Sequence, residues 1–88
     1  MQEKNLTIKN KLGLHARPAA MFVQLTTKYK SNIKVFKGDQ EVDGKSIMGL
    51  MTLAAEMGSQ IRLVIEGEDE QDLINKITEL VESRFNEE

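Results

Sequence analysis

The residues of this chain best suited to chemistry are a histidine and an arginine in the run GLHARPA, residues 13–19. A neutral ring nitrogen of His15 is a nucleophile near pH 7, and a phosphoryl group bound to it stays reactive enough to be passed on. Arg17 follows two positions later, and its planar guanidinium can pair with two phosphate oxygens at once. Gly13 allows the backbone to turn sharply ahead of the histidine. These residue types at this spacing point to a site that holds a phosphoryl group briefly.

Pro18 indicates which element carries this site. Apolar residues recur at spacings of three and four after the histidine, as on one face of a helix that reaches about Tyr29: Pro18, Met21, Phe22, Leu25 and Tyr29. Proline is tolerated only in the first turn, so the helix begins at His15, Ala16 or Arg17. The first turn of a helix has free backbone N–H groups, and we expect those of Ala16 and Arg17 to bind phosphate.

The same residues also have other readings. His15 can be a surface or helix-capping residue with Arg17 as a solvated charge, and residue chemistry alone does not choose between this reading and phosphoryl transfer. Another alternative is a small phosphatase or mutase that uses His15 as its own nucleophile. An 88-residue chain leaves little room for a substrate pocket beside its core, which argues against that alternative.

The apolar pattern predicts the other elements. Alternating residues indicate four strands, at residues 4–9, 33–35, 41–43 and 61–65, with a turn at Gly38-Asp39 between the second and third. Ser46 precedes a short helix that ends near Gly58, with Ile47, Leu50, Met51 and Ala54 on its apolar side. A last helix opens at Asp69 and buries Leu73, Ile74, Ile77, Leu80, Val81 and Phe85. The order βαββαβα predicts one domain, residues 1–88, built as a two-layer α+β sandwich.

The composition argues against several kinds of site. The chain has no cysteine, and a single histidine leaves only carboxylates for a metal, so we expect neither a metal nor a cofactor. The first residues are charged throughout and no run approaches the ~20 apolar residues of a membrane span, which predicts a cytoplasmic protein without a membrane partner. Residues 1–45 carry nine basic and four acidic side chains, but the net charge is −2 and aromatics do not interleave with the basic residues. Nucleic acid is therefore not an expected partner.

Ser46 has two compatible roles at the start of the second predicted helix. Serine is a favoured N-cap residue, and the sequence taken alone favours this structural role. A phosphoserine at a helix start is also well placed against the helix dipole.

Taken together, two motifs resemble those of HPr, the histidine-containing phosphocarrier family of the bacterial phosphotransferase system. GLHARPA resembles its active-site signature and KSIMGLM, Lys45 to Met51, its second signature, while the length and the predicted element order also agree. The resemblance implies a four-stranded antiparallel sheet with three helices on one face. It implies that His15 accepts phosphate at Nδ1 from phosphorylated enzyme I and donates it to enzyme IIA domains of sugar permeases, with Arg17 assisting. Such a protein is a relay and not an enzyme with turnover of its own.

KSIMGLM is similar to the regulatory site of the serine-regulated branch of this family. That similarity implies that an HPr kinase/phosphorylase modifies Ser46, and that the modified protein binds a catabolite control protein and serves enzyme I poorly. We expect a docking surface that includes Met21, Ile47, Met48 and Met51, because methionine side chains adapt to several partners. Leu12 departs from the small polar residue of many members. A regulatory paralogue like Crh, acting mainly through Ser46 on a transcription factor, is the alternative function, but Crh lacks the histidine. A monomer is expected.

Overall fold

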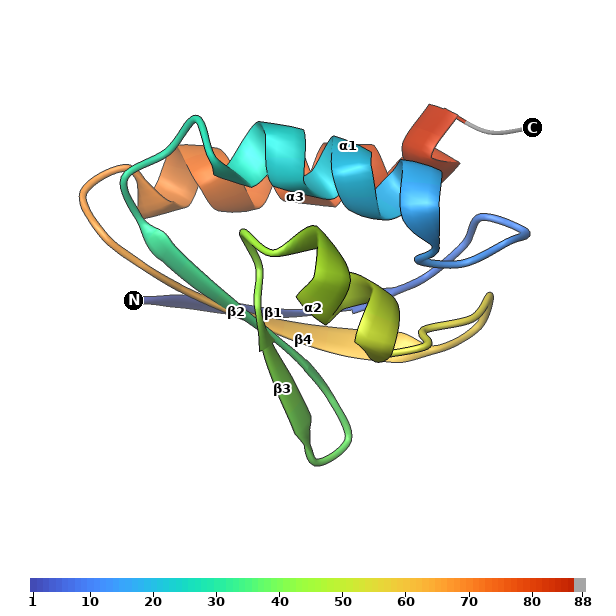
Figure 1. The fold of residues 1–88 in the computed structure, drawn as a ribbon. Coiled ribbons are helices and arrows are strands. Elements are labelled where there is room, and N and C mark those ends of the chain that lie inside the picture. Colours follow the sequence, from blue (N-terminus) through green and yellow to red (C-terminus); the bar gives the residue numbers. More distant parts are fainter. Residues whose placement is uncertain (87–88) are drawn as a thin grey trace.

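The computed structural model of the chain describes residues 1–86, and there the elements follow the predicted order βαββαβα (Figure 1). A short 3₁₀ turn, η1 (Arg84–Asn86), follows the last helix. The elements are β1 (Gln2–Thr7), α1 (Ala16–Thr26), β2 (Asn32–Lys37), β3 (Gln40–Asp43), α2 (Ile47–Thr52), β4 (Gln60–Glu66) and α3 (Glu70–Glu82). Within the described residues, no helix has the length and apolar character that a membrane span needs.

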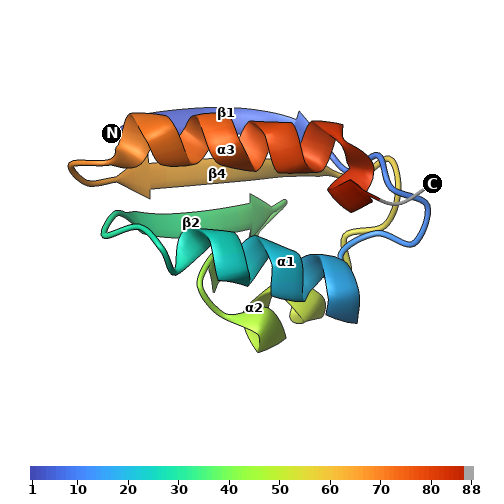
Figure 2. The ribbon, with the colours of Figure 1, turned by 90° about the horizontal axis from the view of Figure 1, so that it is seen from above.

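The four strands form one antiparallel sheet in the order β1-β4-β2-β3. Seen from above, α3 runs along β1 and β4, and α1 lies on the β2 side with α2 beyond it (Figure 2). Register places apolar residues of neighbouring strands opposite one another, such as Ile33 with Ile65 and Leu6 with Ile61. These side chains are buried under the helices with Phe22 of α1. The fold is the expected open-faced sandwich, a sheet with three helices on one face.

Several boundaries differ from the expectation: β1 spans Gln2–Thr7 and not residues 4–9, the other strands extend a residue or two further, and α1, α2 and the C-terminal segment differ as follows. Thr26 ends α1 before Tyr29, and its buried hydroxyl donates to the carbonyl of Gly44 at 2.8 Å, which ties the helix end to the segment before α2. The second helix ends at Thr52, well before Gly58, because Ala54 adopts a left-handed conformation with φ of 52°. Phe85 is buried as expected but lies beyond α3, in the 3₁₀ turn with φ of 54°.

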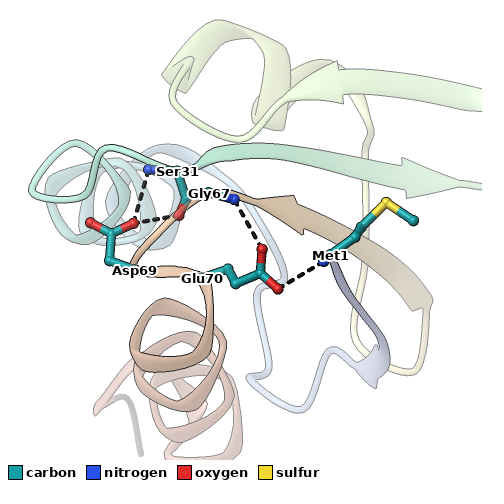
Figure 3. A network of polar contacts seen from close by, with 5 residues as sticks. All are labelled: Met1, Ser31, Gly67, Asp69 and Glu70. Carbon is teal, nitrogen blue, oxygen red and sulfur yellow. Dashed lines mark hydrogen bonds and ion pairs between the residues drawn. The ribbon is translucent and has the colours of Figure 1, made fainter.

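The start of α3 is joined to its neighbours by a network of polar contacts (Figure 3). The carboxylate of Asp69 accepts hydrogen bonds from the Ser31 hydroxyl, from the Ser31 amide at 3.0 Å and from the Lys30 amide at 2.9 Å. The carboxylate of Glu70 accepts from the Gly67 amide at 3.0 Å and pairs with the amino group of Met1 at 2.9 Å. The Ser31 hydroxyl, followed by the Lys30 amide, holds the pKa of Asp69 below its ordinary value of 3.8.

Candidate functional site

His15 lies at the N-cap of α1, with φ of −102° and ψ of −161°, and its side chain is exposed. Its carbonyl accepts the first helical hydrogen bond, from the Ala19 amide at 2.9 Å, but its ring makes no capping hydrogen bond. Pro18 has no N–H group, so the first turn presents the amides of Ala16 and Arg17. Both residues are exposed, and no acidic residue lies in this turn. The helix start is therefore open to an incoming anion.

Close packing fixes the loop that leads to His15. Gly13 has φ of 75°, and a Cβ at this position would overlap the carbonyl oxygen of Ala55 and lie 2.9 Å from Cα of Glu56. The Leu14 amide donates to the same Ala55 oxygen at 2.9 Å, and the buried Asn10 side chain donates to the Gly13 carbonyl at 2.8 Å. The backbone entering the helix is thus held between its own turn and the segment after α2, and only a glycine fits at position 13.

An open hollow lies beside the imidazole. It is lined by Leu12, Leu14, His15, Met51, Ala54, Ala55 and Glu56. Leu12 is 64% exposed, so the hollow has an apolar rim. Its walls come from the two segments that the Gly13 contact brings together. The hollow is open and does not enclose a small molecule.

Ser46 is the N-cap of α2, which confirms its predicted structural role. Its Oγ accepts a hydrogen bond from the Gly49 amide at 3.0 Å, and its own amide donates to the Asp43 carbonyl at 3.1 Å. The side chain is half-buried. Ser46 and His15 belong to different helices, and Met51 at the other end of α2 lines the hollow beside His15.

Comparison with known proteins identifies the family. The family described as the phosphorylation site of the HPr component of the phosphotransferase system matches residues 2–83. The chain belongs to the HPr family. A phosphocarrier protein HPr of Xylella fastidiosa (strain Temecula1) is 51% identical over 87 residues, which cover 99% of this chain and 98% of that protein. The crystal structure of HPr-C-His from Thermoanaerobacter tengcongensis superposes with a TM-score of 0.96 at 49% identity, covering 100% of this chain and 99% of that one.

The family also includes regulatory relatives. A crystal structure of Crh, the catabolite repression protein of Bacillus subtilis, is 39% identical with a TM-score of 0.76 and covers 96% of this chain and 97% of its own. It is described as a dimer with a swapped domain. This relationship links the HPr fold to catabolite regulation as well as to phosphoryl transfer.

The residues expected on a docking surface differ in exposure. Met48 is 73% exposed, and Ile47 and Met51 are each 40% exposed. Met21 is half-buried against the core. Sequence reasoning did not single out Met57, which is 58% exposed and lies after α2. No periodic pattern marks a residue in an irregular segment, so the sequence carried no signal for it.

The segment of Ala54 to Glu56 was also missed as a part of the site. Its members read as the end of a helix, whereas they form the wall of the hollow at His15. The one available signal was Gly13, because a glycine at a turn indicates close approach of another backbone without saying which. Within residues 1–86, no group of three or more histidine, aspartate or glutamate side chains is placed to hold a metal ion.

Proposed function

We propose that residues 1–88 form one carrier domain that accepts a phosphoryl group on His15 from phosphorylated enzyme I and passes it to enzyme IIA domains for sugar uptake. A ring nitrogen attacks phosphorus, the P–N bond forms as the donor's bond to phosphorus breaks, and the same exchange in reverse charges the acceptor. The chain acts as a relay in the cytoplasm, without a cofactor and without turnover of its own. Membership of the HPr family supports this proposal.

The observation that carries the proposal is an exposed imidazole at an open helix start. His15 caps α1 without a side-chain hydrogen bond, and the exposed Ala16 and Arg17 offer their amides beside it. A phosphate bound there receives hydrogen bonds and the favourable end of the helix dipole. This interaction stabilises the phosphohistidine enough to be carried, and the exposure keeps it accessible to the next protein.

Labelled phosphoenolpyruvate and enzyme I test the proposal. The wild-type chain is expected to acquire acid-labile label, which His15→Ala abolishes and Ser46→Ala retains. Labelling by ATP and a serine kinase alone would reject the carrier function in favour of a Crh-like regulator. Release of free phosphate from small substrates by the chain alone would instead favour a phosphatase.

Arg17 is the residue that we assign to assist transfer. Its guanidinium can pair with two oxygens of the phosphoryl group beside His15. Because Arg17 is exposed, Arg17→Ala is expected to slow transfer roughly 10-fold or more while leaving the unfolding free energy within ~0.5 kcal/mol of wild type. Arg17→Lys keeps the charge without the fork and should give an intermediate rate. An unchanged rate in Arg17→Ala would reject the assignment.

We further propose that Ser46 is phosphorylated by an HPr kinase/phosphorylase and that the product binds a catabolite control protein. The exposed Ile47, Met48 and Met51, with the half-buried Met21, would form the docking surface for these partners and for enzyme I. Phosphorylation adds roughly two negative charges at the edge of this surface. The expected result is a higher KM for enzyme I after serine phosphorylation, measured against the unmodified protein. An unchanged KM would contradict this regulation.

We propose that the carrier is a monomer, since successive partners must reach the same face. Sedimentation of the unmodified protein at micromolar concentration tests this proposal. A dimer such as the one described for Crh of Bacillus subtilis would overturn it.

A further inference from the structure

Ala54 adopts an unusual backbone conformation at the edge of the candidate site. Its φ is 52°, a left-handed value. Residues other than glycine, asparagine and aspartate rarely adopt this conformation, because their Cβ crowds the backbone there. Ala54 follows Leu53, the C-cap of α2, and lines the hollow that contains His15. A residue held in this conformation needs support from its surroundings.

Lys37, the last residue of β2, provides such support. Its half-buried side chain donates from Nζ to the carbonyl oxygens of Leu53 at 3.3 Å and of Ala54 at 3.2 Å. Both carbonyls lie just past Thr52, the last residue of α2, where a cation also interacts favourably with the helix dipole. One ammonium therefore ties the turn after α2 to the sheet.

The same turn bears directly on the loop that holds His15. The carbonyl of Ala55, the residue after Ala54, accepts from the Leu14 amide at 2.9 Å and lies against Gly13. Ala54 and Ala55 line the hollow together with His15. A chain of contacts thus leads from Lys37 through this turn to the residue that precedes the histidine.

We propose that Lys37 is a positioning residue for phosphoryl transfer at His15, acting through the left-handed turn at Ala54 and the carbonyl of Ala55. This inference rests on the proposed function of His15. Lys37 does not touch the phosphoryl group. It fixes the wall against which the histidine loop is placed, and transfer between two proteins is sensitive to misplacement of the reacting atom on the scale of 1 Å.

Lys37→Met tests the proposal, because methionine keeps much of the side-chain length and loses the donor. Single-turnover transfer from phosphorylated enzyme I is expected to slow about 10-fold at saturating enzyme I, with KM changed less than about twofold. Lys34→Met is the matched control: Lys34 is on the same strand and pairs with Glu41 at 3.2 Å, away from the hollow. It should transfer at the wild-type rate. Lys37→Arg, which keeps a donor, should recover most of the rate.

A double substitution separates positioning from charge. Glycine adopts the left-handed conformation without strain, so we combine Ala54→Gly with Lys37→Met. The double variant is expected to recover at least half of the loss in transfer rate caused by Lys37→Met, measured on a logarithmic scale. The His15 ring resonances should move in Lys37→Met and return toward wild type in the double variant. A merely stabilising contact would alter the unfolding midpoint and leave these resonances and the saturating rate unchanged.

The possible outcomes distinguish a failure of the role of Lys37 from a failure of the proposed function of His15. A wild-type rate in Lys37→Met overturns the positioning role, as does a raised, salt-dependent KM with an unchanged saturating rate, which would make Lys37 a docking charge. Failure of Ala54→Gly to restore any rate overturns the route through the turn. If the wild-type chain itself takes no label on His15, the proposed function fails instead, and this result is seen before any variant is compared.

Discussion

The starts of α1 and α3 present similar backbone groups in opposite surroundings. At α3, Glu70 and Asp72 place negative charge in the first turn. The Asp69 carboxylate is held by Ser31 (Figure 3) and by the Lys30 amide. At α1 the first turn has no acidic residue, and the cap residue His15 makes no side-chain capping bond. Neither cap residue makes a side-chain capping bond, so the two helix starts differ in charge: carboxylates stand in the first turn of α3, and none stands in that of α1.

This difference shows where the fold gives up stability. An acidic residue in the first turn contributes ~0.3–1 kcal/mol, and α3 has this contribution while α1 lacks it. Its opening is nevertheless not loose, because the Leu14 amide and the Gly13 backbone are held against Ala55. The α1 start is thus open to an anion and fixed in place, which is the combination that a carrier of phosphoryl groups needs.

The largest expected effect comes from breaking the fixed loop at α1. Gly13→Ala places a Cβ against the Ala55 carbonyl at φ of 75°, so we expect the free energy of unfolding to fall by about 3 kcal/mol and phosphoryl transfer to slow with it. Urea unfolding and the labelling assay measure the two effects. Gly38→Ala is the control: φ is 58°, but no atom lies within 4 Å of the new Cβ, so the loss should be only about 1 kcal/mol. Equal losses in the two variants would show that the contact with Ala55 does not matter.

The sequence predicted the elements of both regions more fully than their contacts. Apolar spacing and Pro18 placed the start of α1 at residues 15–17, and the structure begins it at Ala16. Asp69 was correctly placed at the opening of α3, but its side chain bonds to Ser31 and Lys30 instead of capping the helix. Periodicity reports which face of an element is buried, and it contains no information about partners distant in the chain.

The wall of the candidate site shows the same limit. Residues 53–58 continue a plausible helical pattern after Leu50 and Met51, and the sequence predicted a helix to Gly58. The left-handed Ala54 instead ends α2 early and turns the chain toward Gly13. Alanine has the highest helix propensity, so propensity does not explain this termination, and the hydrogen bonds from Lys37 to the Leu53 and Ala54 carbonyls support it.

Filling the open helix start should erase the contrast between α1 and α3. Ala16→Asp adds a carboxylate to the first turn of α1, and its charge competes with an incoming phosphoryl group for the same amides. We expect transfer to slow at least about 10-fold while the unphosphorylated fold gains ~0.3–1 kcal/mol. Gln24→Glu adds the same charge near the far end of α1 and serves as the control in the labelling assay and in urea unfolding. If both variants slow transfer equally, net charge and not the helix start is responsible.

A third helix start, at α2, lies between these extremes because a neutral hydroxyl caps it. Ser46→Ala removes the acceptor of the Gly49 amide and should lower the free energy of unfolding by about 1 kcal/mol, with His15 labelling unchanged. Ser83→Ala, which removes an exposed hydroxyl bonded to the Leu80 carbonyl of its own helix, should cost less than ~0.5 kcal/mol. Chemical denaturation compares the two. Equal costs would contradict the capping role of Ser46.

The smallest expected effect is at α3, where the stabilising contribution of Asp69 depends on pH. The pKa of Asp69 is lowered, first by the Ser31 hydroxyl and then by the Lys30 amide, so its ionised form binds protons less readily in the folded chain than in the unfolded chain. Its contribution to stability is therefore complete above pH 3.8 and is lost as the pH falls toward the folded pKa. Urea unfolding measures this loss. In Asp69→Asn, the free energy of unfolding should fall less than in the wild type as the pH is lowered from about 5 to 2.

Ser31→Ala removes the leading cause of the shift and should raise the pKa of Asp69, so that stability is lost at a higher pH than in the wild type. Asp39→Asn, in the exposed turn between β2 and β3, is the control for removing one carboxylate. Carboxyl resonances followed by NMR titration report the pKa directly. If the free energy of unfolding of Asp69→Asn falls with decreasing pH as steeply as that of the wild type, other carboxylates are responsible for the acid dependence. Neither Asp69→Asn nor Ser31→Ala should slow phosphoryl transfer, because the contacts that hold α3 lie apart from the hollow at His15.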